Sequence, residues 1–227
     1  MTSLTARELE ELRRKVDGID ETIVDLLSER LSVVAEIARV KRSADDHRLA
    51  LRPGREAVVM RRLLAHAAGR FPRGTLARMW RELFGAMTRV QSSLAVSVVV
   101  PEDQPELWDV VRDHFGSLTP IRRAESAEEA LGRIAAGQAQ VAVLPLPGEA
   151  DRWWLGLADG PLRVQARLPF ATLPGYPDHV QAFVVARLPP ESTGDDLTLL
   201  LLETEEVPIG SDPRLSRHLL HLSLIHI

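Results

Sequence analysis

The feature that most constrains this chain is one long, uninterrupted helical stripe near the N-terminus. Apolar residues recur there in steps of three and four from Leu12 to Val40, with no proline and only one glycine, Gly18. This spacing places the apolar side chains on one face of a helix. We therefore predict a single helix from about Ala6 to Arg42, roughly 55 Å long at 1.5 Å per residue.

Two shorter helices are predicted after it. One runs from about Gly54 to Ala68, and the other carries apolar residues at Leu76, Trp80, Leu83, Met87, Val90 and Leu94. Three helices of such unequal length cannot cover the apolar face of the longest one. We therefore expect a homodimer, in which a second copy covers that face. A solvent-exposed coiled coil is the alternative, but it does not explain the two short helices.

After Ser93 the pattern changes to short β-branched runs that alternate with helical segments. The predicted strands lie at 95–100, 140–146, 162–168 and 180–188, and the predicted helices at 107–115 and 126–136. Such alternation predicts an α/β domain with a largely parallel sheet. A polar hinge at 189–195 then leads to a further strand at 197–203.

Charge and composition support this division and exclude several classes of protein. Before position 95 lie 18 basic and 13 acidic residues, and 10 basic and 19 acidic residues follow. The chain has no cysteine, which excludes disulfides and thiolate chemistry. It also has no apolar run of about 18 residues and no signal peptide, so we expect a cytoplasmic protein with no membrane or nucleic-acid partner.

One residue interrupts the apolar stripe of the first helix. Arg30 stands where an apolar residue is expected, and a buried guanidinium needs an anionic partner. Lys41, one of only two lysines, lies about 20° from the same line, and Arg13 points about 100° away, toward the expected partner chain. Arg30 could equally form a structural ion pair with a glutamate.

Further polar candidates follow on the shorter helices: Arg55 and Glu56 after the loop, and Gln91 at the end of the third helix. A pocket with several cations, one carboxylate and one amide suits a small dianion that also carries a hydroxyl group. No nucleophile or metal-ligand cluster accompanies these residues, so we expect neither a metal nor a cofactor.

These residues, in this order, resemble a known family. The matching segments are Leu12-Arg13-Arg14-Lys15-Val16-Asp17-Gly18-Ile19-Asp20, Leu26-Leu27-Ser28-Glu29-Arg30, Ile37-Ala38-Arg39-Val40-Lys41, Arg55-Glu56 and Gln91. Over about residues 6–95 the chain resembles the all-helical class of chorismate mutase. The resemblance implies an intertwined dimer that rearranges chorismate to prephenate for phenylalanine and tyrosine biosynthesis, in the shikimate pathway.

The resemblance also implies roles for single residues. Arg13 would be the arginine borrowed from the partner, Arg30 and Arg55 would bind carboxylates, Lys41 and Gln91 would bind the ether oxygen, and Glu56 would bind the substrate hydroxyl. The chain departs from the family at Met87, where a small hydroxyl residue is common, and at Arg52, in a loop that often holds a carboxylate.

Residues 96–203 resemble a prephenate dehydratase domain in layout. The catalytic Thr-Arg-Phe triplet reads Gln181-Ala182-Phe183 here, and the serine loop after the first strand is replaced by residues 101–105, so we expect no dehydration. The expected class is thus α + α/β: a three-helix mutase domain (1–95), an α/β dehydratase-like domain (96–193) and the truncated start of an ACT-like unit (194–227). Residues 222–227 resemble translated sequencing adapter, and we expect that tail not to be native.

Two other functions fit parts of this pattern. An isochorismate pyruvate lyase shares the helical fold and the cationic pocket, although such chains are shorter and lack a dehydratase-like region. A sensor without catalysis, whose α/β part binds an aromatic amino acid, is the reading that involves no enzyme.

Overall fold

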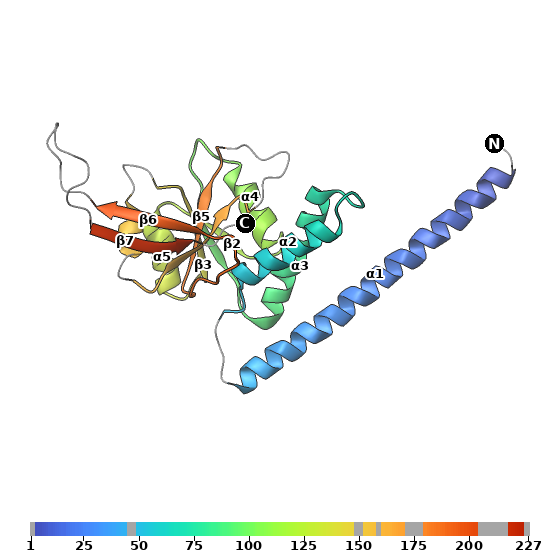
Figure 1. Cartoon of the computed structure of the whole chain (residues 1–227), viewed down its shortest axis with the longest axis horizontal. Helices are drawn as coiled ribbons and strands as arrows, with labels where there is room; N and C mark the ends of the chain where they lie inside the picture. Colours follow the sequence, from blue (N-terminus) through green and yellow to red (C-terminus); the bar gives the residue numbers. More distant parts are fainter. Residues whose placement is uncertain are drawn as a thin grey trace. The chain divides into compact units, whose positions relative to one another are not determined.

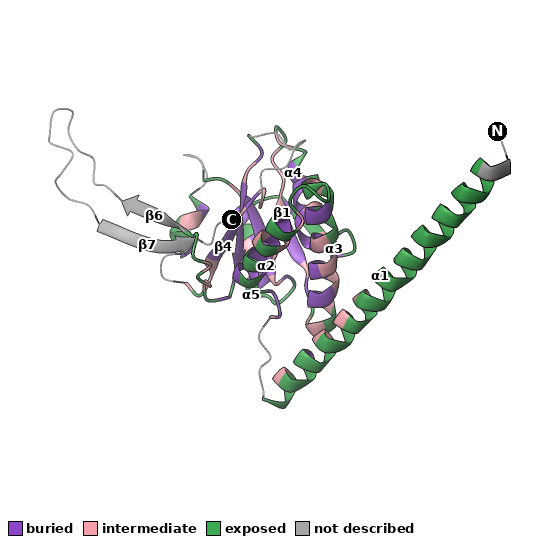
Figure 2. Ribbon diagram, turned by 45° about the vertical axis from the view of Figure 1, so that its right-hand side comes forward, coloured by how far each residue is buried: buried purple, intermediate pink, exposed green. Residues whose placement is uncertain are grey.

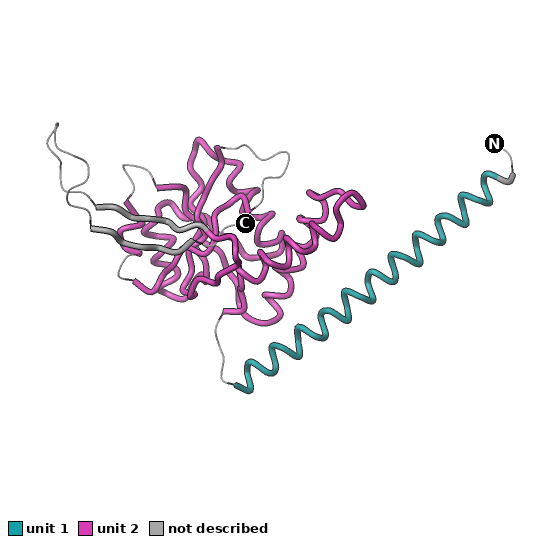
Figure 3. The backbone as a smooth tube through the Cα atoms, in the orientation of Figure 1, with its two compact units in different colours: residues 1–48 teal, residues 49–227 magenta. Residues whose placement is uncertain are grey.

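The computed structural model describes residues 3–44, 49–147, 152–157, 160–170, 179–203 and 218–224. The chain divides into two compact units, residues 1–48 and 49–227, which Figure 3 colours separately. None of the described helices is long and apolar enough to cross a membrane.

In the described part of unit 1 lies one long helix, α1 (Ser3–Ser43), which confirms the predicted long helix. Its 41 residues correspond to roughly 62 Å. Figure 2 shows α1 exposed along almost its whole length. The apolar residues of the stripe are exposed as well. Their exposed fractions lie between 44% and 60%, for Leu12, Val16, Ile19, Ile23, Leu26, Val33, Ile37 and Val40.

Unit 2 begins with a helical hairpin that confirms the two shorter predicted helices. It consists of α2 (Pro53–His66) and α3 (Arg73–Gln91). Pro53 stands at the start of α2, where its missing N–H is not needed. Five residues of the two helices form the buried core of the hairpin: Met60, Leu64, Leu76, Ala77 and Phe84.

The buried face of α3 differs from the prediction. Trp80 and Leu83 are only half-buried and Val90 is 47% exposed. Leu76 and Met87 of the predicted stripe are buried, but the other buried positions of α3 are Ala77, Arg81, Phe84, Gly85 and Thr88. The physical reason is that α3 packs against both α2 and α4 of its own unit, through a face rotated from the most apolar one. The most apolar face of α3 thus remains partly uncovered in unit 2.

A five-stranded sheet follows in the order β2-β1-β3-β5-β4. The strands are β1 (Val96–Val99), β2 (Ile121–Ala124), β3 (Val141–Pro145), β4 (Arg163–Leu168) and β5 (Ala182–Ala186). Strand β2 was not predicted, because its four residues include two exposed arginines and so show no apolar run. The other four strands confirm the prediction to within a few residues.

The prediction of a largely parallel sheet is wrong for half of it. Strand β1 pairs in parallel with β2 and β3, but β3–β5 and β4–β5 are antiparallel. Parallel neighbours need a long crossover, and α4 (Leu107–Phe115) and α5 (Ala127–Ala135) supply it for the first three strands. Between β3 and β4, the described residues form no α-helix, and their one helical element is the short 3-10 helix Trp153–Leu157.

Both faces of the sheet are covered, as Figure 1 shows. On one face, valines of β1, β3 and β5 pack with α4 residues such as Leu107 and Val111. On the other face, the alternate residues of β3 and β5 pack with α5 and with Trp153 and Leu157. This alternation explains why these strands are apolar throughout.

The helical hairpin docks on the α/β part through α3 and α4. Arg78 forms an ion pair with Asp113 at 3.0 Å, and the Glu82 carboxylate accepts a hydrogen bond from the Ser117 N–H at 2.8 Å. At Gly85 a Cβ atom would lie 2.2 Å from the Phe115 carbonyl oxygen, so only glycine allows this approach. The hairpin and the sheet therefore belong to one packed unit.

The last described element is a separate two-stranded antiparallel sheet of β6 (Leu197–Glu203) and β7 (His218–Leu224). Strand β6 has the bounds predicted for it. Residues 225–227 of the tail that we expect not to be native lie outside the described residues. The assignment of 194–227 to an ACT-like unit, like the domain boundaries at 95 and 193, stays a prediction.

Candidate functional site

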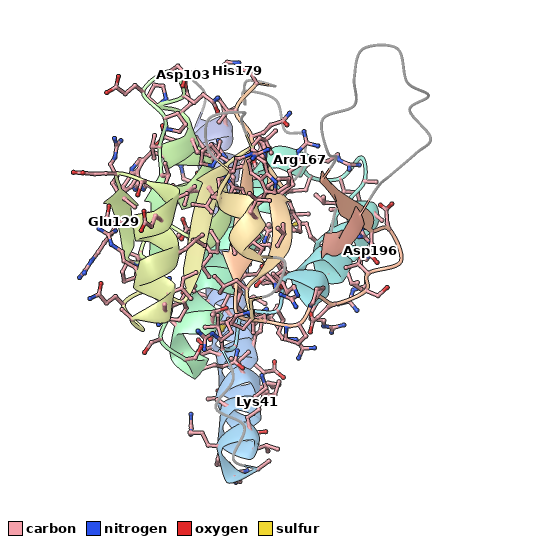
Figure 4. All side chains as sticks on the ribbon, turned by 90° about the vertical axis from the view of Figure 1, so that its left-hand side faces the viewer. Lys41, Asp103, Glu129, Arg167, His179 and Asp196 are labelled. Atoms are coloured by element: carbon pink, nitrogen blue, oxygen red, sulfur yellow. The ribbon has the colours of Figure 1, made fainter. Side chains whose placement is uncertain are left out.

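Helix α1 carries Arg30 and Lys41 on neighbouring lines of one face. Both are half-buried, in contrast to the exposed apolar residues of the same helix. Figure 4 shows Lys41 near the C-terminal end of α1. Burial lowers the pKa of Arg30, and its Nη1 is buried without a hydrogen-bond partner among the described residues. The structural ion pair that sequence reasoning left open for Arg30 is therefore not seen in the described part of the chain.

Arg13 lies on an exposed part of α1. Its Nη1 is 3.8 Å from the Glu10 carboxylate, one turn earlier, and both side chains are well exposed. Such a surface pair contributes little to stability. Because its side chain is exposed, the Arg13 guanidinium is accessible to a ligand or to a second chain.

Helix α2 presents Arg55 and Glu56 at neighbouring positions, about 100° apart around the helix axis. Arg55 is exposed and Glu56 is buried. The Glu56 Oε2 accepts a hydrogen bond from the Arg81 Nη1 at 2.8 Å. In unit 2, Arg55 is thus available to an anion, whereas Glu56 already has a cationic partner.

The Glu56–Arg81 pair lies deep in unit 2. Burial raises the pKa of Glu56, and the charge of Arg81 opposes this shift. Burial also lowers the pKa of Arg81 to about 10, which leaves it cationic at neutral pH. The guanidinium of Arg81 lies over the ring of Phe170, 3.4 Å from its centroid. Removing one member of such a buried pair typically costs about 3–5 kcal/mol.

His114 of α4 lies beside this pair. Burial, and then the charge of Arg81, hold the pKa of His114 well below its usual 6.5, so the ring is neutral in the folded protein. Its Nδ1 has no hydrogen-bond partner among the described residues. A cavity of about 10 Å³, the size of one water molecule, is lined in part by Glu56, Thr88 and His114.

Gln91 is the last residue of α3 and is half-buried. Its Nε2 donates to the main-chain oxygen of Met87 at 3.2 Å, one turn earlier. The side chain of Met87 is itself buried. This contact with its own helix holds the Gln91 amide close to the end of α3.

The predicted site residues therefore fall into two groups. Arg13, Arg30 and Lys41 lie on α1 in unit 1; Arg55 and Glu56 on α2, and Gln91 on α3, lie in unit 2. Among the described residues, no cluster of three or more His, Asp or Glu side chains is arranged to hold a metal ion.

Sequence reasoning missed Arg81, although the sequence contains a signal for it. Arg81 follows Ala77 by four residues and precedes Phe84 by three, so it stands in a buried helical stripe just as Arg30 stands in the stripe of α1. The prediction was drawn along the more apolar neighbouring face, which passes through Trp80 and Leu83.

Comparison with known proteins gives the same family for the helical part. Residues 12–92 match the family of chorismate mutase type II. The bifunctional chorismate mutase/prephenate dehydratase of Stutzerimonas stutzeri is 28% identical over 149 residues, which are 64% of this chain and 40% of that protein. The protein of the same description from Pseudomonas aeruginosa is 26% identical over 147 residues, 63% of this chain and 40% of its own.

A third such bifunctional protein, from Aquifex aeolicus, is 31% identical over 100 residues, 42% of this chain and 27% of its own. No solved structure matches the chain. The chain spans about 40% of the length of the first two relatives. Since their aligned stretches are longer than segment 12–92, the likeness extends beyond the helices. Residues 12–92 of this chain are therefore a chorismate mutase type II domain, followed in the same chain by a mixed α/β region.

Proposed function

We propose that this chain is a chorismate mutase, an isomerase that converts chorismate to prephenate in the cytoplasm. The observation that carries the proposal is the chorismate mutase type II domain at residues 12–92. Within it, the half-buried Arg30, whose Nη1 has no hydrogen-bond partner among the described residues, shares a helix face with Lys41. A partly desolvated guanidinium with an unused donor is suited to bind a substrate carboxylate.

The proposed reaction needs no nucleophile, proton transfer or cofactor. In the pericyclic shift the C–O ether bond breaks as a C–C bond forms, and negative charge develops on the ether oxygen. The protein must hold the compact conformer of chorismate and place donors on that oxygen. We assign Arg30 and Arg55 to the two carboxylates, Lys41 and Gln91 to the ether oxygen, and Glu56 to the hydroxyl group.

Gln91 suits this role because its amide donates a hydrogen bond at any pH. In the structure the amide nitrogen donates within its own helix, to Met87, at 3.2 Å. A substrate oxygen would compete with this weak, partly exposed contact, because the developing charge makes it a stronger acceptor than a main-chain carbonyl.

We also propose that the active form is a homodimer. The support is the row of exposed apolar residues along α1, which far exceeds what a soluble helix normally leaves uncovered. The most apolar face of α3 is also partly exposed, with Val90 at 47% and Met79 at 45%. In this proposal a second copy covers both faces, and Arg13 of one chain completes the site of the other.

We do not propose a dehydratase activity for the α/β domain. Where the resemblance calls for threonine and arginine, Gln181 accepts a hydrogen bond from Arg167 and Ala182 is fully buried at the start of β5. Neither residue offers a hydroxyl group or a free charge to assist loss of water and carbon dioxide.

The test is to incubate the purified chain with chorismate and to identify the products by NMR. We expect prephenate to accumulate in proportion to enzyme, without enzyme-dependent phenylpyruvate. Persistence of chorismate would contradict the proposal and favour the sensor, whose α/β part would then bind an aromatic amino acid in calorimetry. Release of pyruvate from isochorismate at a higher kcat/KM would instead favour the lyase.

A further inference from the structure

The segment between β5 and β6 contacts the first turn of α2, which carries Arg55 and Glu56. We call residues 189–196 the strap. It follows β5 and leads directly into β6 at Leu197. Sequence reasoning treated this stretch as a polar hinge. In the structure it is instead fixed to α2 at two places, through Glu191 and through Thr193.

The N-cap residue of α2 makes no side-chain hydrogen bond to the first turn. This residue is Arg52, whose side chain has only donors. Glu191 supplies the missing acceptor from the strap: its Oε2 accepts from the Arg55 main-chain N–H at 3.3 Å, and its Oε1 pairs with the Arg52 Nε. The carboxylate thus serves the helix N-terminus as an N-cap side chain normally does, from 136 residues away in sequence.

Gly54 shows how closely the strap approaches α2. A Cβ atom at this position would lie 2.6 Å from the Glu191 Cβ and 3.1 Å from the Glu191 carbonyl oxygen. Any residue other than glycine would push the strap away from the helix. The main chain of the strap thus lies against Gly54, and this close approach brings the Glu191 carboxylate to the N-terminus of α2.

The strap is itself held in shape. Arg61, two turns along α2, donates to the Thr193 carbonyl oxygen at 3.1 Å and to its Oγ1 at 2.6 Å. The Asp196 carboxylate accepts from the Thr193 N–H and Oγ1 and from the Ser192 Oγ. Figure 4 labels Asp196 at the end of this segment, beside the ribbon of α2. These hydrogen bonds fix the conformation of the strap, and with it the position of Glu191.

We infer that Glu191 is a positioning residue of the mutase site: it orders the first turn of α2, so that Arg55 is held in place to bind a substrate carboxylate. This inference rests on the proposed function. Because the Arg55 N–H and the Arg52 side chain share one carboxylate, loss of Glu191 frees the main chain of the turn that bears Arg55. The effect acts on substrate binding rather than on the ether oxygen, which belongs to Lys41 and Gln91.

The test compares Glu191→Ala and Glu191→Gln with a matched control, Asp195→Ala, an exposed strap residue four positions on. In full-length protein we expect Glu191→Ala to speed amide hydrogen exchange over 54–57 about fivefold, the equivalent of a lost cap of about 1 kcal/mol. We expect the KM for chorismate to rise about fivefold with kcat within about twofold. Glu191→Gln keeps an oxygen that accepts from the Arg55 N–H. Its amide exchange rates over 54–57 should therefore lie closer to those of the wild type than to those of Glu191→Ala.

A purely structural role would give a different result, because partial unfolding lowers kcat through the amount of active protein and leaves KM unchanged. Unchanged KM and exchange in Glu191→Ala, or an equal effect of Asp195→Ala, would overturn the inference. A wild-type chain that does not convert chorismate would overturn the proposed function instead, and the exchange rates would still decide whether Glu191 orders the turn.

Discussion

At the residue scale, Lys41 is the donor on which the proposed chemistry depends most. It is half-buried near the end of α1 and points along nearly the same line as Arg30. In the proposed mechanism its ammonium group donates a hydrogen bond to the ether oxygen and stabilises the negative charge that develops there. A donor lost from such a site typically costs about 100-fold or more in rate, because nothing else in a water-poor pocket replaces it.

We therefore expect Lys41→Ala to lower kcat for chorismate about 100-fold or more, with the far-UV circular dichroism and molecular mass unchanged. The chain offers a matched control, since Lys15 is the only other lysine and is exposed on the same helix. Lys15→Ala should retain nearly full activity. An active Lys41→Ala protein would contradict the assignment of Lys41.

His114 predicts a pH dependence of stability. Its pKa in the folded protein lies well below 6.5, because of burial and then Arg81. Below about pH 6.5 the unfolded chain binds a proton that the folded chain does not, so the free energy of unfolding falls on acidification, by up to about 1.4 kcal/mol per pH unit. The neighbouring Glu56 has a raised pKa and acts in the opposite direction, since its folded form takes up a proton more readily.

His114→Gln removes the first contribution and keeps the second. We expect urea unfolding to show a smaller loss of stability between about pH 7.5 and about pH 5.5 in the variant than in the wild type. Because Glu56 and Arg81 are present in both proteins, the difference between the two proteins isolates His114. Equal losses would show that His114 is not held neutral in the fold.

At the element scale, the helices were predictable because their periodicity is local. The 3.6-residue repeat of α1, and the Ser126 cap that accepts from the Glu129 N–H at 3.1 Å, are readable from neighbouring residues. Strand β2 and the antiparallel β4–β5 pairing depend on which distant strand lies alongside, which no local pattern encodes. The same limit applies to the site: Arg30 and Lys41 follow from one repeat, whereas Arg81 and Glu191 take their roles from residues 25 and 136 positions away.

The exposed stripe of α1 gives a prediction for assembly. Ile19 is 58% exposed in the single chain, where a polar replacement would change stability by only about 0.5 kcal/mol. In the proposed dimer the same position is covered, and burying an unpaired carboxylate there costs several kcal/mol.

We expect sedimentation velocity to show a wild-type dimer and a dissociated Ile19→Asp chain that has also lost mutase activity. Glu21→Gln is the control, since Glu21 lies about 200° around the helix from Ile19 and should leave the dimer intact. An Ile19→Asp chain that sediments as the wild type does would show that this stripe is not the interface.

At the scale of the whole molecule, the chain combines a helical hairpin that is integral to the α/β unit with a long helix whose apolar face is uncovered. The segment 12–92 that matches chorismate mutase type II includes most of α1 and all of α2 and α3, so the proposed site residues lie in both units. The central claim is that two chains build each site, with Arg13 reaching across to the site that holds Arg30.

Subunit mixing tests that claim most directly. Arg13→Ala and Arg30→Ala are each expected to be inactive on chorismate, because every site in either homodimer lacks one arginine. After exchange, a heterodimer has one site with both arginines and one with neither, so random mixing should restore about a quarter of the wild-type activity. The account predicts this recovery, with prephenate as the product. Heterodimers that form but stay inactive would contradict it.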